Sequence, residues 1–421
     1  MPSFGGSPLW RNQAFRRVWT AATISVFGSL VSGIALPFVA ILVLGAGPLE
    51  VAALGMVSLA ATLLVGLAAG AWVDRLRRGP VLIWADLGRA LLLGSIPVAF
   101  VAGVLSLAQL LVVTFLAALL TTFFEAADHA YLPTIVERDQ LVEANGALAA
   151  SGSAAEFTAF GIGGFLVQVL TAPIAVLVDA ASFVVSAILL GSIRKPEPEP
   201  PPRVDREPVL TEIRAGLRLV IADPVLRAFA AARMAIGAMY GIFGGIWLLF
   251  ATKELGLGPA AIGVIAGVGG IAALAGATAA APATRRWGVG RVAAAAVAVT
   301  ALGNFFIPLA PSGAPLVAAA SLIVAQLVAA SSATVYEVTE TSVRQTLVGG
   351  RALGRVGSTF RVADVLVQLV AMFLGALLAQ AAGLRVAAVI APFWAVLAAV
   401  ILWASPAGRL LVLPASPDRD A

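Results

Sequence analysis

Twelve long apolar runs follow one another down the sequence, separated by short segments rich in glycine, proline and charge. Each run approaches the about 20 residues that a helix needs to cross the hydrocarbon core of a bilayer. The runs are continuous and do not alternate between apolar and polar residues, so they predict helices and not barrel strands. An all-α integral membrane protein is expected, with helices over residues 17–44, 51–73, 80–102, 107–128, 144–170, 173–193, 226–252, 260–283, 290–309, 315–337, 352–381 and 385–405.

The composition agrees with this class and excludes several others. Of the 421 residues, 60% are hydrophobic and 12% are charged, whereas soluble domains have about a quarter charged residues. Cysteine is absent and His129 is the one histidine, so neither a metal site nor a disulfide framework is predicted. The sequence has no phosphate-binding loop for ATP, so no enzyme and no cofactor is expected, and energy would come from a proton gradient.

Basic residues occur in alternate loops, which predicts the orientation of the chain. By the positive-inside rule both termini are cytoplasmic, in the inner membrane of a bacterium, and the even number of helices agrees. The first apolar run is too long for a cleavable signal peptide and is predicted to be a membrane helix. The basic residues behind the net charge of +5 lie between the helices and not on a soluble face, so no nucleic-acid partner is expected. The expected partners are the bilayer and a small molecule, and a monomer is expected.

A linker divides the chain into two parts. The segment RKPEPEPPPRVDREP, residues 194–208, is predicted to be extended and flexible. The predicted domains are residues 1–193, a cytoplasmic linker over 194–224, and residues 225–421. In the linker Leu210, Ile213, Leu217 and Val220 share one face, which predicts an amphipathic helix on the membrane surface.

An internal repeat indicates that the two halves share one structure. Three residues of the first exterior turn recur 211 positions later (256 − 45 = 211): Gly45, Gly47 and Pro48 match Gly256, Gly258 and Pro259. Glu125 recurs as Glu337 at an offset of 212. Two pseudo-symmetric six-helix halves are therefore predicted.

The loop between helices two and three carries the most specific motif. Its sequence GAWVDRLRR, residues 70–78, resembles the signature loop of the major facilitator superfamily. The resemblance implies a cytoplasmic gate in which Gly70 permits close helix packing, Asp74 faces a helix N-terminus, and Arg75 and Arg78 pair with carboxylates such as those of helix four. A loop that merely carries positive charge is the alternative.

Three further segments resemble one exporter branch of this superfamily: residues 123–146, the run VDAASFVVSAILL of helix six, and EIRAGLRLVIADPVLRA before helix seven. That branch includes siderophore exporters, macrolide and tetracycline efflux proteins, and lysophospholipid transporters. The resemblance implies export of a small molecule by alternating access.

Ionisable residues inside membrane helices are the main functional candidates, because burying a charge in a bilayer costs about 2.5 to 3.5 kcal/mol. Glu156 lies near the middle of helix five and is predicted to carry the coupling proton, with a packing role as the alternative. Glu125 and Asp128 are placed at the cytoplasmic end of helix four, and Glu337 and Glu340 at that of helix ten. They are interpreted as gate latches, or as groups that transfer protons directly.

Two helix faces are candidates for the substrate cavity. Arg361, Asp364 and Gln368 share a face of helix eleven, either as a structural clamp, as substrate ligands or, for Asp364, as a proton carrier. A stripe on helix seven is interpreted as a stacking surface or as an interfacial belt: Tyr240, Phe243 and Trp247. Gln326 on helix ten is a further cavity candidate, whereas Asp86 and Arg89 on helix three are predicted to be a structural pair.

Together these features predict a secondary transporter that exports amphipathic small molecules, such as drugs and other xenobiotics, by proton antiport. The alternatives are a lysophospholipid or siderophore transporter, and a membrane receptor or scaffold that transports nothing.

Overall fold

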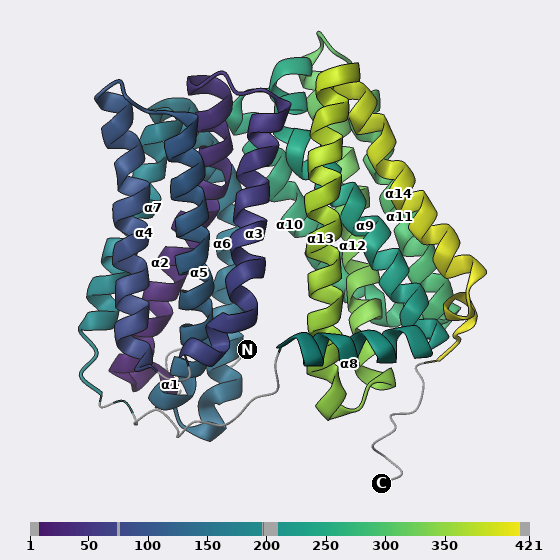
Figure 1. Cartoon of the computed structure of the whole chain (residues 1–421), viewed down its shortest axis with the longest axis horizontal. Coiled ribbons are helices and arrows are strands. Elements are labelled where there is room, and N and C mark those ends of the chain that lie inside the picture. The colour runs from purple at the N-terminus through teal and green to yellow at the C-terminus, as the bar shows by residue number, and fades with distance from the viewer. Residues whose placement is uncertain (1–7, 74–75, 196, 198–208, 413–421) are drawn as a thin grey trace. The chain divides into compact units, whose positions relative to one another are not determined.

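The computed structural model describes residues 8–73, 76–195, 197 and 209–412, and within them no strand occurs. Twelve helices of this described part are long and apolar enough to cross a membrane, which confirms the predicted class (Figure 1). They are α2 (Gln13–Phe38), α3 (Pro48–Val73), α4 (Arg78–Val101), α5 (Leu107–Ile135), α6 (Leu141–Leu170), α7 (Ala172–Gly191), α9 (Pro224–Leu249), α10 (Pro259–Trp287), α11 (Val289–Leu309), α12 (Pro315–Leu347), α13 (Gly350–Ala382) and α14 (Leu384–Ala404).

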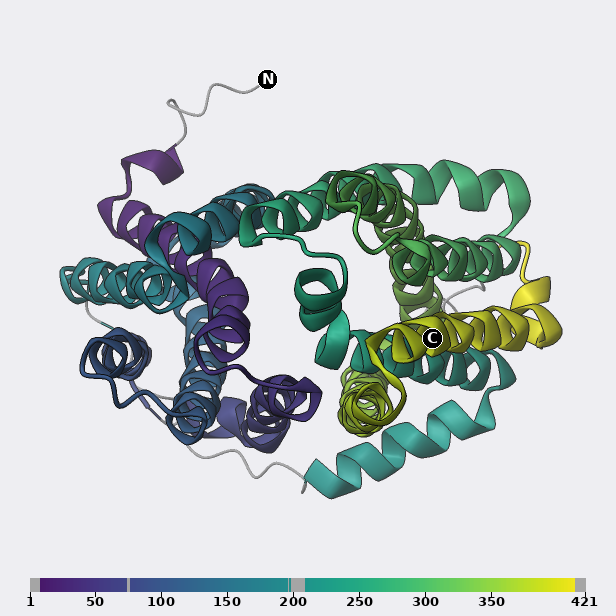
Figure 2. The ribbon, with the colours of Figure 1, turned by 90° about the horizontal axis from the view of Figure 1, so that it is seen from above.

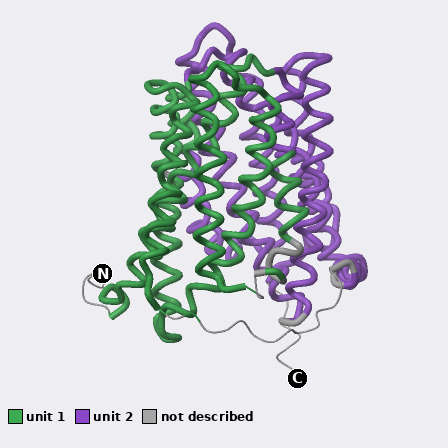
Figure 3. Tube along the Cα trace, turned by 60° about the vertical axis from the view of Figure 1, so that its left-hand side comes forward, with its two compact units in different colours: residues 1–46, 57–205, 259–267 green, residues 47–56, 206–258, 268–421 purple. Residues whose placement is uncertain are grey.

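The chain forms two compact units, coloured separately in Figure 3. Unit 1 comprises residues 1–46, 57–205 and 259–267, and unit 2 comprises residues 47–56, 206–258 and 268–421. Within unit 1, α2 packs against α6 and α7, and α4 packs against α5 and α7. Unit 2 repeats this arrangement with α9 against α13 and α14, and α11 against α12 and α14, as the end-on view of Figure 2 shows.

The helix that opens each unit begins with the same kind of cap. The Asn12 side chain accepts hydrogen bonds from the N–H groups of Ala14 and Phe15 at 3.0 and 3.3 Å. At an offset of 211 (223 − 12 = 211), the Asp223 carboxylate accepts from Val225 and Leu226 at 2.8 and 2.9 Å. Both caps satisfy N–H groups that have no partner inside the helix.

The same two helices also end alike. Each finishes in a π-helical turn, η1 (Val39–Val43) after α2 and η3 (Phe250–Glu254) after α9. Each turn is followed by a glycine with a positive φ, +69° at Gly45 and +66° at Gly256. The internal repeat of the sequence is therefore present in the backbone, down to the local geometry of the turns that follow α2 and α9.

Helices α5 and α12 are longer than the sequence predicted. They end at Ile135 and Leu347, not at residues 128 and 337, because Pro133 is accommodated inside α5 and the charged residues of α12 remain helical. Glu125 consequently lies ten residues before the end of α5 (135 − 125 = 10), which is about 15 Å along the axis. The predicted placement of these carboxylates at the helix ends was wrong by two to three turns.

The predicted amphipathic helix is present as α8 (Val209–Ala222), which runs across the end of α13 within unit 2 (Figure 1). The Thr359 hydroxyl donates to the Ile213 carbonyl at 3.3 Å, and Gly216 leaves no room for a methyl group against α13. Val220 is buried, whereas Leu217 and Ile221 are exposed. One apolar face of α8 thus packs on unit 2 while further apolar side chains remain available to a membrane surface.

Candidate functional site

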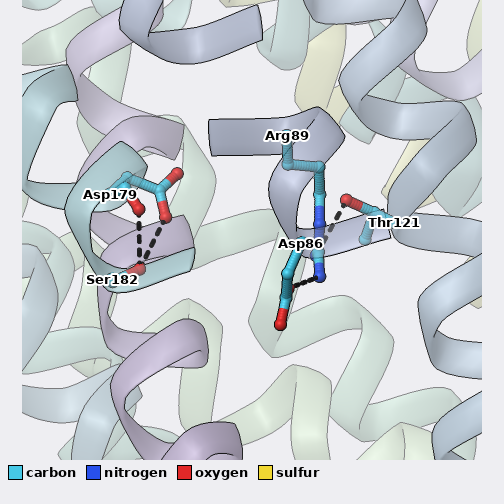
Figure 4. Close-up of polar contacts among 5 residues, drawn as sticks. All are labelled: Asp86, Arg89, Thr121, Asp179 and Ser182. Carbon is cyan, nitrogen blue, oxygen red and sulfur yellow. Dashed lines mark hydrogen bonds and ion pairs between the residues drawn. The ribbon is translucent and has the colours of Figure 1, made fainter. Parts of the chain in front are cut away.

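A buried charge cluster lies in the interior of unit 1, between α4 and α7 (Figure 4). Arg89 Nη2 forms an ion pair with Asp86 Oδ1 on the same helix, and Arg89 Nη1 donates to Thr121 Oγ1 at 3.4 Å. Asp86 is 0% exposed and Arg89 is 2% exposed. The structural pair predicted from the sequence is confirmed.

Two aromatic rings enclose the Arg89 guanidinium. Its central carbon lies 4.3 Å from the ring centre of Phe124 on α5 and 4.0 Å from that of Phe183 on α7. A guanidinium over an aromatic face is attracted by the ring quadrupole, more strongly where water is excluded. The Arg89 side chain is therefore enclosed, and it contacts α5 and α7 from α4.

Asp179 on α7 is the second carboxylate of this cluster, and the sequence analysis did not select it. The Ser182 hydroxyl lies 3.2 Å from Asp179 Oδ1 and 2.8 Å from the Asp179 carbonyl oxygen. A methyl group at Gly28 on α2 would overlap both Ser182 Oγ and Asp179 Oδ1. An acidic residue within the apolar run of helix six was the signal that could have identified it.

A second charged site lines a pocket of about 110 Å³ in unit 2. Arg233 on α9 donates from Nε and Nη2 to Asp364 Oδ2 on α13, at 3.2 and 3.1 Å. The pocket is also lined by Tyr240, Thr300, Tyr336, Glu337 and Gln368. Residues from four helices, α9, α11, α12 and α13, therefore converge on one ion pair.

The close approach of α9 to α13 depends on glycine. A methyl group at Gly237 would overlap Asp364 Oδ1, and one at Gly241 would lie 2.5 Å from the Gln368 carbonyl oxygen. Tyr336, on the opposite side of the pocket, has a buried hydroxyl with no hydrogen-bond partner among the described residues. Buried polar atoms are normally satisfied, so this hydroxyl is suited to bind water or a ligand in the pocket.

The two faces that were predicted to form the substrate cavity meet in part, because Tyr240, Asp364 and Gln368 line the same pocket. Asp364 and Gln368 line the unit 2 pocket, but Arg361 is exposed and the ionic partner of Asp364 is Arg233. The predicted pairing of Arg361 with Asp364 was therefore wrong, because the partner lies 131 residues away in sequence and reaches Asp364 through helix packing.

The residues of the aromatic stripe of helix seven differ in their surroundings, and Gln326 does not line the pocket. Tyr240 lines the pocket, Phe243 is 8% exposed and belongs to the core, and Trp247 is half-buried. Gln326 is half-buried, with its Nε2 atom 3.0 Å from the position of a methyl group at Gly269 on α10. Within unit 2, Tyr240 is the one member of the stripe that faces the pocket.

The described gate residues have different local partners. Glu337 lines the unit 2 pocket, whereas Glu340 is buried and pairs with Arg344, one turn away, at 3.4 Å. Arg78 pairs at 3.9 Å with Glu197 and not with a carboxylate of α5, because Glu197 also accepts from the N–H groups at the start of α4. Gly70 belongs to α3, and the predictions for Asp74 and Arg75 lie outside the described residues.

The remaining proton-coupling candidates differ in how far their side chains are exposed. Glu125 is exposed, and Asp128 is half-buried beside His129. Glu156 is exposed on the face of α6 that, one to two turns later, brings Phe160 and Gly164 against Gly263 of α10 within unit 1. A charged side chain in a membrane helix that is not packed inside the bundle is expected to face a water-filled cavity.

A large apolar groove is the third notable feature, in unit 1 between α2, α6 and α7. It encloses about 950 Å³, and Trp19, Phe27 and Val185 contribute to its lining. The polar groups in its lining include the hydroxyls of Thr158 and Ser182. Among the described residues no group of three acidic or histidine side chains could hold a metal ion.

Sequence and structural comparisons agree on the class of protein. The profile of the Major Facilitator Superfamily matches residues 18–249, so this chain belongs to that superfamily of membrane transporters. No curated protein sequence matches the chain.

Solved structures with the same fold transport different substrates. A bacterial homologue of the iron transporter ferroportin is 18% identical, with a TM-score of 0.75 over 94% of this chain and 98% of that chain. A bacterial homologue of the human lysosomal transporter Spinster is 15% identical, with a TM-score of 0.70 over 98% and 100% of the two chains. The nucleoside transporter NupG is 11% identical, with a TM-score of 0.76 over 93% and 98%. At these identities the similarity defines the fold alone.

Proposed function

We propose that this transporter exports amphipathic small molecules, with drug-like cations as the main class, in exchange for protons. The observation that carries this proposal is the charge of the unit 2 pocket, where the carboxylates of Glu337 and Asp364 face the single guanidinium of Arg233. The excess negative charge suits a proton or the cationic group of a substrate, and the ring of Tyr240 suits contact with the apolar body attached to that group.

Glu156 supports the coupling step. Its carboxylate is exposed on a membrane-spanning helix of unit 1, where contact with lipid would cost about 2.5 to 3.5 kcal/mol for a charge. In the proposed cycle, access to water lets this carboxylate exchange a proton with the solvent. Glu156 in unit 1 and the acidic pocket in unit 2 would then give each unit a group that responds to protons or substrate.

The orientation completes the proposal. The loops rich in arginine are placed in the cytoplasm, with both termini on that side and the protein acting as a monomer in the inner membrane of a bacterium. Amphipathic α8 would then lie on the cytoplasmic surface of the bilayer, with Arg214 and Arg218 near the lipid headgroups.

Dye efflux from proteoliposomes tests the proposed activity. Purified protein is reconstituted around a fluorescent cationic dye, and efflux is followed with and without an imposed pH gradient. The wild type is expected to release dye faster with the gradient, and Glu156→Gln is expected to lose this stimulation. Glu137→Gln, at an exposed position after α5, is the matched control and should behave as the wild type. If the wild type releases dye at the same rate with and without the pH gradient, proton antiport is excluded.

Lysophospholipid transport is a second candidate, favoured by the groove of unit 1. Its volume of about 950 Å³ and its apolar lining are suited to an acyl chain, and all its lining helices are membrane spans or α1 (Pro8–Arg11). Replacing Thr158 by Trp would narrow the groove. If this variant loses movement of a fluorescent lysophospholipid but retains dye efflux, the groove serves lipids, and if both activities persist the second candidate fails.

A further inference from the structure

Asp179 lies in the interior of a membrane-spanning unit, and its hydrogen bond is to a neutral hydroxyl group and not to a cation. Asp179 is 1% exposed, and the Ser182 hydroxyl lies 3.2 Å from its Oδ1 atom, with the Ser32 hydroxyl also nearby. Among the described residues, the ion pair of Arg89 is with Asp86 and not with Asp179. From α2, Gly28 packs directly against the carboxyl group.

The charges around Asp179 do not balance. On α4, Arg89 attracts Asp179 but is ion-paired with Asp86, so one guanidinium serves two carboxylates. The next charged groups are Glu125 and Asp128 on α5, which are both acidic and act on Arg89 and Asp86 from a distance. An ionised Asp179 would therefore add an unpaired negative charge to a region of low dielectric, where such charges are strongly disfavoured. Binding of one proton removes this charge.

We propose that Asp179 is a proton-binding residue of unit 1, with its carboxyl group neutral in the structure described here. The proton binds to one carboxylate oxygen and leaves as it came, so no other covalent bond changes. When the proton leaves, Asp179 becomes a second anion that competes with Asp86 for the single guanidinium of Arg89. Arg89 is held between Phe124 and Phe183, so this competition acts directly on the contact between α4, α5 and α7.

A role in transport rests on the proposed proton coupling, but proton binding by Asp179 does not. This site also differs from Glu156, because Glu156 is exposed on α6 whereas Asp179 is enclosed. The two residues can therefore be tested separately.

Infrared spectroscopy of the purified full-length protein in detergent measures proton binding directly. A protonated carboxylic acid has a C=O stretching band that an ionised carboxylate lacks. The wild type is expected to show such a band at neutral pH, and Asp179→Asn is expected to lose it. Asp139→Asn, at an exposed position before α6, is the matched control and should retain the band. A band that is unchanged in Asp179→Asn would overturn the proposal.

A second variant keeps the test decisive if Asp179→Asn does not fold. Ser182→Ala removes the hydroxyl that contacts Asp179 Oδ1, so the C=O band should shift in position. A band that does not move in this variant belongs to another acid and contradicts the assignment.

Dye efflux by the same preparations separates the two proposals. If no dye is transported but Asp179→Asn loses the band, the proposed function fails and the proton-binding residue stands. If dye efflux follows the pH gradient while the band persists in Asp179→Asn, the function stands and the assignment to Asp179 fails.

Discussion

Arg89 in unit 1 and Arg233 in unit 2 are both arginines inside membrane helices, but their surroundings differ. Arg89 pairs with a carboxylate three residues away on its own helix and is enclosed by two aromatic rings. Arg233 reaches Asp364 on another helix, and its side chain is 35% exposed where it lines a pocket. The arginine of unit 1 is thus part of the buried core, whereas the arginine of unit 2 lines a pocket.

The position equivalent to Arg89 in unit 2 sharpens this comparison. At the offset of 211 (300 − 89 = 211) stands Thr300, which shares a hydrogen bond of 2.9 Å with Ser332 and lines the pocket. The helix starts of the two units have the same kind of cap, and the turns after α2 and α9 share a π-helical turn and a positive-φ glycine, but the buried charges of the two units differ. The repeat therefore conserves the backbone of the membrane helices while the chemistry has diverged.

The largest expected difference between the units is in stability. Arg89→Ala empties the space between Phe124 and Phe183 and leaves Asp86 without its partner, so a loss of about 3 to 5 kcal/mol is expected. Arg233→Ala should lose less, about 1 to 3 kcal/mol, because water can reach the pocket. Thermal unfolding in detergent compares the two variants, and an equal or larger loss for Arg233→Ala would contradict the distinction between a closed and an open pair.

A glycine substitution tests how tightly the unit 2 pair is built. In Gly237→Ala the new methyl group overlaps Asp364 Oδ1, so either the Asp364 carboxylate or α9 must shift, and the ion pair to Arg233 is disturbed. A loss of about 1 to 3 kcal/mol is expected, together with loss of dye efflux. Gly33→Ala is the matched control, because a methyl group there meets nothing within 4 Å, and it should leave both properties unchanged.

The turns between the last two helices of each unit offer a smaller test. Thr171 has φ +76°, whereas Gly383, its counterpart in unit 2 (383 − 171 = 212), has φ +98°. A residue with a β-carbon is strained in this region by about 1 to 3 kcal/mol. Thr171→Gly is therefore expected to raise the stability slightly, by about 1 kcal/mol after the entropy of glycine is subtracted. Gly383→Thr should lower it, and stabilisation by that second variant would show that the two turns are not equivalent.

The smallest expected change in stability concerns the Tyr336 hydroxyl. Because this group has no hydrogen-bond partner among the described residues, Tyr336→Phe should leave the unfolding temperature unchanged. If the hydroxyl binds substrate, the variant should raise the KM for dye efflux about tenfold, the effect of losing about 1.4 kcal/mol of binding. An unchanged KM would show that substrate does not contact Tyr336.

The membrane helices could be predicted because apolar length alone defines them. The offset of 211 residues could be predicted because the turn residues Gly45 and Gly256 recur in the sequence, and both have a positive φ in the structure. The extension of α5 could not, since Pro133 and the preceding charged residues are typical of a helix end. Contacts across helices determine that boundary, and one sequence does not display them.

The charged sites were predicted only in part, for a related reason. Asp364 stood out because a carboxylate in a membrane helix is conspicuous, but its neighbour Arg361 was a closer partner in sequence than Arg233. Arg233 and Asp179 lie within predicted membrane helices, so the energetic argument that selected Asp364 applies to them equally. A full survey of intramembrane charges would have found both residues, although not the packing that gives each its partner.

The measurement that tests the central claim most directly is proton movement driven by substrate. A permanently charged cationic dye is added outside proteoliposomes that contain a pH indicator, with valinomycin and equal potassium on both sides to hold the membrane potential at zero. Proton antiport predicts that dye entry makes the interior more alkaline, and that Glu156→Gln abolishes this change. Dye entry through the wild type without any change in internal pH would contradict proton coupling and leave facilitated diffusion in its place.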